Sequence, residues 1–161
     1  MGLISYRRVP CGGTSLRLGV DIGTEIIRIC RFDYSGQLDL NVILNTPEPA
    51  MPGAVTVAIC ENLLTVDPDF RATLVGVSLP GEIDPTGRIL KSSTQLTEWI
   101  NVPLADWLEP RISRRVNLIN SIKCLQLVEN SHIHSSNIKN EIFACFGAAL
   151  LAYEKFTNFM D

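Results

Sequence analysis

Features that mark several classes of protein are missing from this sequence. Near its carboxyl end, the longest stretch without a charged or amide side chain covers residues 142–153, well short of the roughly 20 residues of a membrane span. No cluster of basic residues is longer than Arg114–Arg115, and the net charge is −3. We therefore expect no transmembrane helix and no nucleic-acid partner.

Metal ligands and paired thiols are also scarce. The chain has five cysteines and two histidines, and no two cysteines form a C-x-x-C pair. Buried free thiols are therefore expected rather than a metal site. His132 and His134 stand in a polar stretch without a third ligand, which is more typical of solvated loop residues. No apolar run follows Arg7 and Arg8, so a secretory signal is not indicated and a cytoplasmic location is expected.

What the chain does contain is enough apolar sequence for one hydrophobic core. Its 161 residues are 46% hydrophobic and 19% charged, a balance typical of a folded domain rather than of a disordered segment. This length suits one domain of ordinary size. We expect an irregular tail over residues 1–15, a main lobe over 16–129, and a connection with a returning helix over 130–161.

The first part of the lobe has the two-residue period of β-strands. Apolar residues alternate over 16–22, β-branched and aromatic residues crowd 26–32, and alternation returns over 38–44. The turns between these segments are short, at residues 23–24 and 35–36. The three strands are therefore predicted to form an antiparallel meander.

After the meander, strands and helices are predicted to alternate. Segments 53–64 and 102–112 suit helices, the second with Pro103 in its first turn. Segment 72–79 is a continuous apolar run, as expected of a strand buried on both faces, and segment 116–120 is another short apolar strand. This order of elements predicts an α/β fold with a mixed sheet.

Two further helices are predicted toward the carboxyl end. The segment 122–130 is amphipathic, with Ile122, Leu125 and Val128 on its apolar stripe. A last helix is expected over about 138–156, after a short polar connection.

Three groups of polar or glycine residues follow predicted strands, where α/β sheets tend to bind ligands. The first is Asp21–Thr24, in which a carboxylate precedes a turn whose backbone amides could face a phosphate. The second is the Gly- and Pro-rich loop 78–87, and the third is Asn120–Ser121. A plainer interpretation exists for the first two groups, because Asp and Gly also shape hairpins, and Asp84, before a proline, is typical of a turn rather than of a general base.

In this order, these segments resemble the amino-terminal lobe of the ROK family, which joins bacterial sugar kinases and sugar-responsive repressors. The similarity resumes over 146–152, which is similar to the family's closing helix. Trp99 belongs to the similar segments, and it is expected to pack in the lobe, as is Trp107. The segments that carry the similarity are Leu18–Thr24, Val75–Gly87, Trp99 with Pro103–Leu104, and Val116 to Glu129.

The resemblance implies a ribonuclease H-like lobe, as in actin, hexokinase and Hsp70, which normally meets a second lobe across a nucleotide cleft. About sixteen residues separate Glu129 from Phe146, where a family member carries most of that second lobe. A single lobe is therefore predicted. The family's second phosphate loop, adenosine site, cysteine-rich zinc motif and Glu-x-Gly-His element are not found in this sequence.

The resemblance also implies roles for the strand-end residues. Asp21, Gly23 and Thr24 match the first phosphate loop, which is expected to be vestigial because it is one Gly shorter and Glu25 stands where a cation is common. Ser121 takes the position of the Asp that serves as general base in the family. Because a serine hydroxyl is a very poor base near neutral pH, no catalytic residue is expected.

Sugar binding is a separate expectation from catalysis. Gly81, Asn120 and Glu129 are the candidate residues for a retained sugar site, and a small sugar is the candidate ligand. No metal ligand and no cofactor are expected. ATP and Mg²⁺ enter only if the chain is a kinase.

The last helix is apolar on all sides, so it must be covered on more than one of them. A single small lobe covers one side. We therefore expect a homodimer or a hetero-assembly through this helix. The residues expected in that contact are Ile142, Phe143, Phe146, Leu150 and Tyr153.

Two functions are open at this point. One is a truncated, catalytically inactive relative of a sugar kinase that acts as a sugar-sensing or assembly module. The other is an ATP-dependent hexose kinase that completes its active site by oligomerisation.

Overall fold

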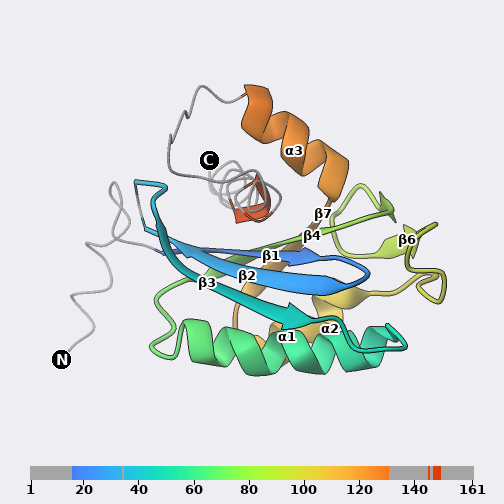
Figure 1. Cartoon of the computed structure of the whole chain (residues 1–161), viewed down its shortest axis with the longest axis horizontal. Helices are drawn as coiled ribbons and strands as arrows, with labels where there is room; N and C mark the ends of the chain where they lie inside the picture. The colour runs from blue at the N-terminus through green and yellow to red at the C-terminus, as the bar shows by residue number, and fades with distance from the viewer. Residues whose placement is uncertain (1–15, 34, 131–144, 146, 150–161) are drawn as a thin grey trace.

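A computed structural model of the chain describes residues 16–33, 35–130, 145 and 147–149. The predicted tail over 1–15, the connection over 131–137 and most of the predicted last helix lie outside these residues. The described part forms a mixed β-sheet with helices on both of its faces (Figure 1). The α/β class is confirmed.

The sheet has five strands in the order β3-β2-β1-β4-β7. Strands β1 (Arg17–Ile22), β2 (Ile26–Phe32) and β3 (Leu38–Asn45) pair in antiparallel fashion, which confirms the predicted meander. Strands β4 (Leu74–Leu79) and β7 (Arg115–Asn120) add to β1 in parallel. The carboxyl ends of β1, β4 and β7 therefore meet at one edge of the sheet.

Two helices, α1 (Pro52–Val66) and α2 (Leu104–Ile112), cover one face of the sheet (Figure 1). α1 begins at Pro52. Proline suits the first position of a helix because a backbone N–H there would have no intrahelical acceptor, and proline has no such N–H. α2 begins two residues later than predicted. The reason is that Val102 pairs with Leu90 in a β-bridge instead of entering the helix.

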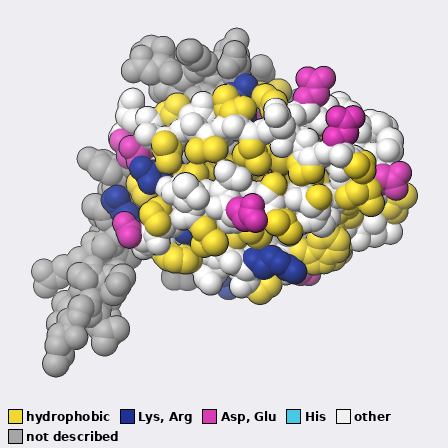
Figure 2. Space-filling view, turned by 60° about the horizontal axis from the view of Figure 1, so that its bottom comes forward, with side chains coloured by type: hydrophobic (Ala, Val, Ile, Leu, Met, Phe, Trp, Pro, Cys, Tyr) yellow, Lys and Arg dark blue, Asp and Glu magenta, His cyan; other side chains and the backbone are white. Residues whose placement is uncertain are grey.

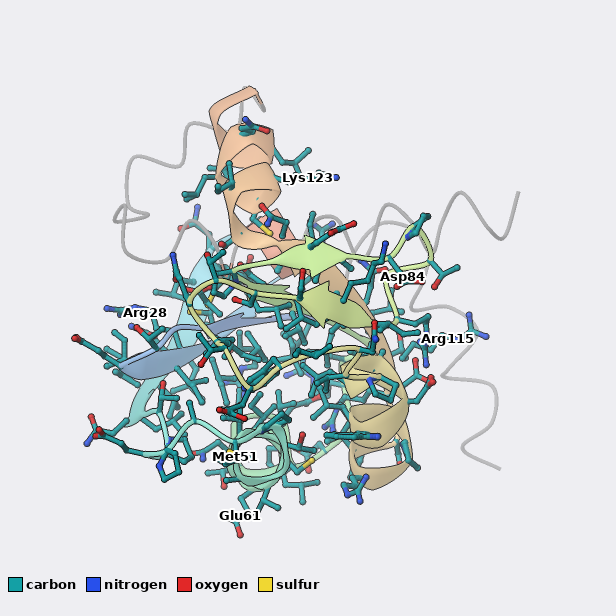
Figure 3. All side chains as sticks on the ribbon, turned by 90° about the vertical axis from the view of Figure 1, so that its right-hand side faces the viewer. Arg28, Met51, Glu61, Asp84, Arg115 and Lys123 are labelled. Atoms are coloured by element: carbon teal, nitrogen blue, oxygen red, sulfur yellow. The ribbon has the colours of Figure 1, made fainter. Side chains whose placement is uncertain are left out.

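A short hairpin was not predicted from the sequence. Strands β5 (Glu82–Ile83) and β6 (Leu90–Ser92) pair in antiparallel fashion and stand apart from the main sheet. Such short strands carry too few residues to show a period. The hairpin encloses the loop 84–89, which lies beside the sheet edge (Figure 3).

The face under α1 and α2 holds the main hydrophobic core. Leu18, Val20 and Ile22 of β1 point into it, and all three are almost fully buried. Trp99 is also fully buried, and its Nε1–H donates to the carbonyl oxygen of Ala50 at 2.7 Å. The prediction that Trp99 packs in the lobe is confirmed.

The opposite face carries α3 (Ser121–Asn130) and the helical residues 145 and 147–149 (Figure 1). Gly19 of β1 and Gly76 of β4 are paired neighbours on this face. A Cβ on Gly19 would overlap the carbonyl oxygen of Cys145, and one on Gly76 would overlap that of Ala148. The two glycines thus let a helix backbone lie directly on the sheet.

The buried side of α3 differs from the predicted apolar stripe. Cys124 and Val128 are buried, whereas Ile122 is 63% exposed and Leu125 is 38% exposed. Cys124 packs with Ile119 of β7 and with Ala148. A small side chain faces inward here because the helical residues above the sheet come so close.

The cysteines in the described part of the chain are free and buried, as predicted: Cys30, Cys60, Cys124 and Cys145. No helix among the described residues is long and apolar enough to cross a membrane. Within the same residues, no group of three or more His, Cys, Asp or Glu could hold a metal ion.

Candidate functional site

The candidate site lies where β1, β4 and β7 end, at the edge that faces the viewer in Figure 3. Asp21 of β1 is the register partner of Ser78 of β4, and Leu79 of β4 is the register partner of Asn120 of β7. Pairing between the strands therefore brings all three sequence-predicted groups to one edge.

Asn120 connects two of these groups through its side-chain amide. Its Nδ2–H donates to the carbonyl oxygen of Gly81 at 2.6 Å. Its Oδ1 accepts from the backbone N–H groups of Ile122 and Lys123, at 2.9 and 3.3 Å, and so caps the first turn of α3. The structure brings Gly81 and Asn120 together, but the amide oxygen is already used and only one N–H remains for a ligand.

Gly81 has a structural reason to be glycine. Its φ of +144° lies in a region that L side chains rarely adopt, and a Cβ there would overlap the carbonyl oxygen of Ser92. Because glycine tolerates this φ, the chain can turn here from β4 into the β5–β6 hairpin.

Asp84 organises the loop within that hairpin. Its Oδ1 accepts from the backbone N–H groups of Arg88 and Ile89, each at 2.8 Å, and its Oδ2 accepts from the hydroxyl of Thr86. Burial opposes ionisation of Asp84, but these hydrogen bonds outweigh it and lower its pKa to about 2. Asp84 is therefore a turn-forming residue and is a very weak base at neutral pH.

Arg88 fastens the same loop to the rest of the lobe, a role that sequence reasoning missed. Its guanidinium pairs with Glu109 and Asp106 of α2 and donates to the carbonyl oxygen of Val116 of β7 at 3.1 Å. Hydrogen bonds from Arg88 lower the pKa of Glu109, which stays ionised. The residues next to Arg88 in the sequence do not indicate this role, because its partners are 18 or more positions away.

Asp21 has an unusual electrostatic environment. Burial raises the pKa of its carboxyl group, and the Ser78 hydroxyl and the charge of Arg28 only partly oppose this. Arg28 lies opposite Asp21 in the β1–β2 register. The Ser78 hydroxyl is itself buried and has no hydrogen bond of normal geometry. A carboxylate held in this way costs stability, which is a common property of functional residues.

The turn after Asp21 is closed by its own hydrogen bonds. The Gly23 N–H donates to the carbonyl oxygen of Ile26 at 3.0 Å, and the Gly23 carbonyl accepts from the Thr46 hydroxyl at 2.8 Å. The Gly23 amide is therefore engaged and does not face a phosphate. Thr24 and Glu25 are exposed at the tip of the turn. The hairpin-shaping interpretation describes Gly23 better than the phosphate-binding one.

Ser121 and Glu129 lie at opposite ends of α3. Ser121 is half-buried and follows Asn120 directly at the sheet edge. Glu129 is eight positions farther along, so its backbone lies ~12 Å along the helix axis from that of Ser121. The structure thus brings Gly81, Asn120 and Ser121 together but not Glu129, whose side chain lies outside the described residues.

His132 and His134 lie outside the described residues. So do all five residues predicted for the assembly contact, namely Ile142, Phe143, Phe146, Leu150 and Tyr153.

The sequence model of the ROK family matches residues 17–149, which include both the main lobe and the helical residues 145 and 147–149. This chain belongs to the ROK family. The match confirms the resemblance read from the strand-end motifs.

A curated relative and two solved structures give the scale of the similarity. Over 112 residues the chain is 30% identical to a glucokinase of Thermotoga maritima, covering 70% of this chain and 35% of the glucokinase. A ROK glucokinase of Streptomyces griseus, solved with glucose and AMPPNP, superposes with a TM-score of 0.65 at 23% identity. An inorganic polyphosphate/ATP-glucomannokinase of Arthrobacter sp. strain KM superposes with a TM-score of 0.66 at 26% identity.

These three proteins are considerably longer than this chain. The superpositions cover 71% and 78% of this chain but only 36% and 51% of the glucokinase and the glucomannokinase. The chain thus spans about a third to a half of their length. Within that span it has the actin-like fold of ROK sugar kinases, which confirms the predicted ribonuclease H-like lobe.

Proposed function

We propose that this ROK lobe does not transfer phosphoryl groups and acts as a sugar-sensing or assembly module. The observation that carries the proposal is Ser121, which follows Asn120 at the sheet edge. The family resemblance puts the general-base Asp at this position. The nearby carboxylate Asp84 does not replace it, because its hydrogen bonds and its pKa of about 2 make it a poor proton acceptor.

Loss of the base has a predictable cost. General acid–base assistance typically contributes ~10²–10⁴ in rate, and serine does not supply it at neutral pH. Phosphoryl transfer also requires that the negative charge of the phosphates is neutralised, mostly by hydrogen-bond donors and cations that the site holds in place in advance. Here the Gly23 N–H already donates a hydrogen bond to the carbonyl oxygen of Ile26, and Glu25 adds a negative charge to the turn.

The short length of the segment between α3 and Cys145 also supports the proposal. Residues 131–144 connect Asn130 of α3 with Cys145, which lies against Gly19 of the sheet. Fourteen residues are too few for a second folded lobe, since independent domains below ~40 residues usually need disulfides or metals. The site edge is thus built from one lobe over the matched residues.

A sensing role would use the groups that remain at the edge. The candidate residues are Gly81 and Asn120, with Glu129 as the more distant third, and the candidate ligand is a small sugar. We place the protein in the cytoplasm, where free thiols such as Cys30 and Cys145 stay reduced.

Calorimetric titration and a coupled ADP-release assay test the proposal together. We would compare the wild type with Asn120→Ala using glucose, mannose and N-acetylmannosamine, each with and without ATP and Mg²⁺. Binding of one sugar that is lost in Asn120→Ala, without ADP release, supports a sensor. Absence of binding to any sugar supports the assembly role. ADP release above background that disappears in Asp21→Ala would overturn the proposal.

One observation favours a second function, an ATP-dependent hexose kinase that completes its site by oligomerisation. Asp21 is a partly buried carboxylate at the end of β1, and a carboxylate there could hold a Mg²⁺ ion through water. ATP would supply the phosphoryl group. The control variant is Ser121→Asp, which restores a carboxylate at the position of the general base. If the wild type is inert and this variant turns over substrate, the chain is a relative of a kinase that has no activity of its own.

A further inference from the structure

Two buried thiols meet on the α3 face of the sheet. Cys30 of β2 is the register partner of Gly19 of β1, so its side chain stands beside the position where Gly19 has none. The backbone of Cys145 fills that position, because its Cα lies 3.2 Å from the place of a Cβ on Gly19. The missing side chain of Gly19 therefore brings Cys145 next to Cys30.

The surroundings of Cys30 and Cys145 show that the two thiols are in contact. Both side chains are fully buried, and they belong to one cluster with Phe32, Val128 and Ala149. The Sγ–H of Cys145 donates to the carbonyl oxygen of Arg28, which lies 117 positions earlier in the chain, at 3.5 Å. Burial raises the pKa of the Cys145 thiol, and a hydrogen bond with the Cys30 side chain raises it further. The two sulfur atoms thus lie within hydrogen-bonding distance of each other.

The other two cysteines of the described residues have different surroundings. Cys60 belongs to α1, on the side of the molecule that Figure 2 brings forward, so the sheet lies between it and Cys145 (Figures 1 and 2). Cys124 of α3 packs in a separate cluster with Ile119 and Ala148, and burial raises the pKa of its thiol to about 12. Within the part of the chain that the structure describes, Cys30 and Cys145 are therefore the pair of thiols placed to react with each other.

The helical residues around Cys145 contact the sheet through small side chains. Cys145, Ala148 and Ala149 are buried in this contact, and the sheet below them presents Gly19 and Gly76. Because little apolar side-chain area is buried here, local opening of this contact costs less free energy than unfolding of the whole lobe. Such an opening exposes both thiols, and it is the route by which a small oxidant reaches them.

We propose that Cys30 and Cys145 form a reversible disulfide when the protein meets a peroxide. In the open state, the thiolate of one cysteine attacks hydrogen peroxide, which breaks the O–O bond and gives a sulfenic acid and hydroxide. On closure, the second thiol attacks the sulfenic sulfur, so that the S–S bond forms and the S–O bond breaks with release of water. In total, two thiols and one hydrogen peroxide give one disulfide and two waters, and two electrons pass from the sulfurs to the peroxide.

The disulfide locks the helical residues 145 and 147–149 to β2. A link between positions so far apart in the sequence also restricts the unfolded chain strongly. Gly19 and Asp21 lie on the same face of β1, two positions apart, so the lock acts beside the candidate site. The disulfide is independent of the proposed function, because neither thiol belongs to the candidate phosphate or sugar groups. In a reducing cytoplasm it is transient, as is typical of disulfides that sense oxidants.

Peptide mapping of the full chain tests the inference directly. Trypsin puts each of the five cysteines into a different peptide, because a Lys or Arg separates each cysteine from the next. The reduced protein is treated with hydrogen peroxide, alkylated with N-ethylmaleimide in denaturant and digested without reductant. We expect peptide 29–31 linked to peptide 140–155, and dithiothreitol should separate them. A link that involves any other cysteine in place of this pair, or alkylation of both thiols after peroxide treatment, would overturn the inference.

Thermal unfolding supplies a second readout, which reports the lock rather than the bond. Peroxide should raise the thermal midpoint of the wild type by ~5–15 °C, and dithiothreitol should reverse the shift. Cys30→Ala and Cys145→Ala should abolish it. The matched control is Cys60→Ala, which removes a buried thiol on the other side of the sheet and should keep the shift. A shift that persists in Cys145→Ala would contradict the lock. If either alanine variant fails to fold, the mapping and the dithiothreitol reversal in the wild type still decide.

Discussion

The two faces of the sheet are built from different kinds of residue. Toward α1 and α2, β1 presents Leu18, Val20 and Ile22, which fill a continuous core. On the other face the same strand presents Gly19 and Asp21. One face therefore supplies most of the hydrophobic stabilisation, and the other allows a helix backbone and polar groups to come close to the sheet.

The two faces therefore contribute differently, because one stabilises the fold and the other holds the polar groups that could bind a ligand. On the α3 face, beside the glycines, β1 and β4 contribute a partly buried carboxyl with a raised pKa and the buried Ser78 hydroxyl, which has no hydrogen bond of normal geometry. Groups of this kind reduce stability unless a ligand or partner satisfies them. The α1–α2 face holds mainly apolar side chains and offsets that cost.

The largest effect is expected from the α1–α2 face. Ile59→Ala removes a fully buried side chain from the core and should lower the free energy of unfolding by ~2–5 kcal/mol. Urea denaturation followed by circular dichroism measures this change. Val57→Ala in the same helix is the control, because Val57 is largely exposed. Equal effects of the two substitutions would contradict the assignment of the core.

A smaller and more local effect is expected on the other face. Gly76→Ala places a methyl group against the carbonyl oxygen of Ala148 and should cost ~1–3 kcal/mol, mainly by displacing Ala148 and Ala149. Hydrogen exchange should increase around Cys145 and change little in α1. Gly53→Ala is the control, since nothing lies within 4 Å of a Cβ there. Uniform exchange along the chain would show that the two faces unfold together.

Acid should affect the loop that borders the site. The pKa of Asp84 is lowered from 3.8 to about 2, so its ionised form stabilises the fold above pH 3.8, and this stabilisation is lost as the pH falls toward 2. Asp84→Asn should lower the thermal midpoint at pH 7 and remove this part of the acid dependence. A variant with the wild-type midpoint at pH 7 would show that the loop is held by Arg88 alone.

The smallest effect has the opposite sign. Because burial raises the pKa of Asp21, ionisation of this group is unfavourable in the fold, and the wild type loses stability as the pH rises from 3.8 through the raised pKa. Asp21→Asn should therefore raise the thermal midpoint at pH 7 and leave it unchanged near pH 3. Differential scanning calorimetry at the two pH values measures this. A lower midpoint at pH 7 would mean that the pair with Arg28 stabilises the fold.

Local patterns predicted most of the main elements. β-branched and aromatic residues over 26–32 and alternation over 38–44 located β2 and β3, and the apolar segments 72–79 and 116–120 located β4 and β7. These patterns are readable because a strand buries every second residue, or every residue, over several positions. The order of the elements and the strand-end motifs were sufficient to recognise the family, which the sequence match over 17–149 confirms.

The candidate site was only partly predictable. The sequence placed Asp21, Gly81 and Asn120 after strands, and the pairing of β1, β4 and β7 brings these strand ends together. It did not show that Asn120 caps α3 and holds Gly81 at the same time, nor that the Gly23 amide is already engaged. Such hydrogen bonds depend on which loops become neighbours in the fold.

The sequence by itself determined the α/β class, the meander and the family, because these depend on short-range periodicity and on motifs within a few residues. Only the tertiary structure decided which side of α3 is buried, why Gly19 and Gly76 lack side chains, and how Arg88 holds the loop. In each case the decisive neighbour is distant in the sequence: Ala148 lies 72 positions beyond Gly76, and Glu109 lies 21 positions beyond Arg88. Contacts of that range exist only once the sheet has assembled.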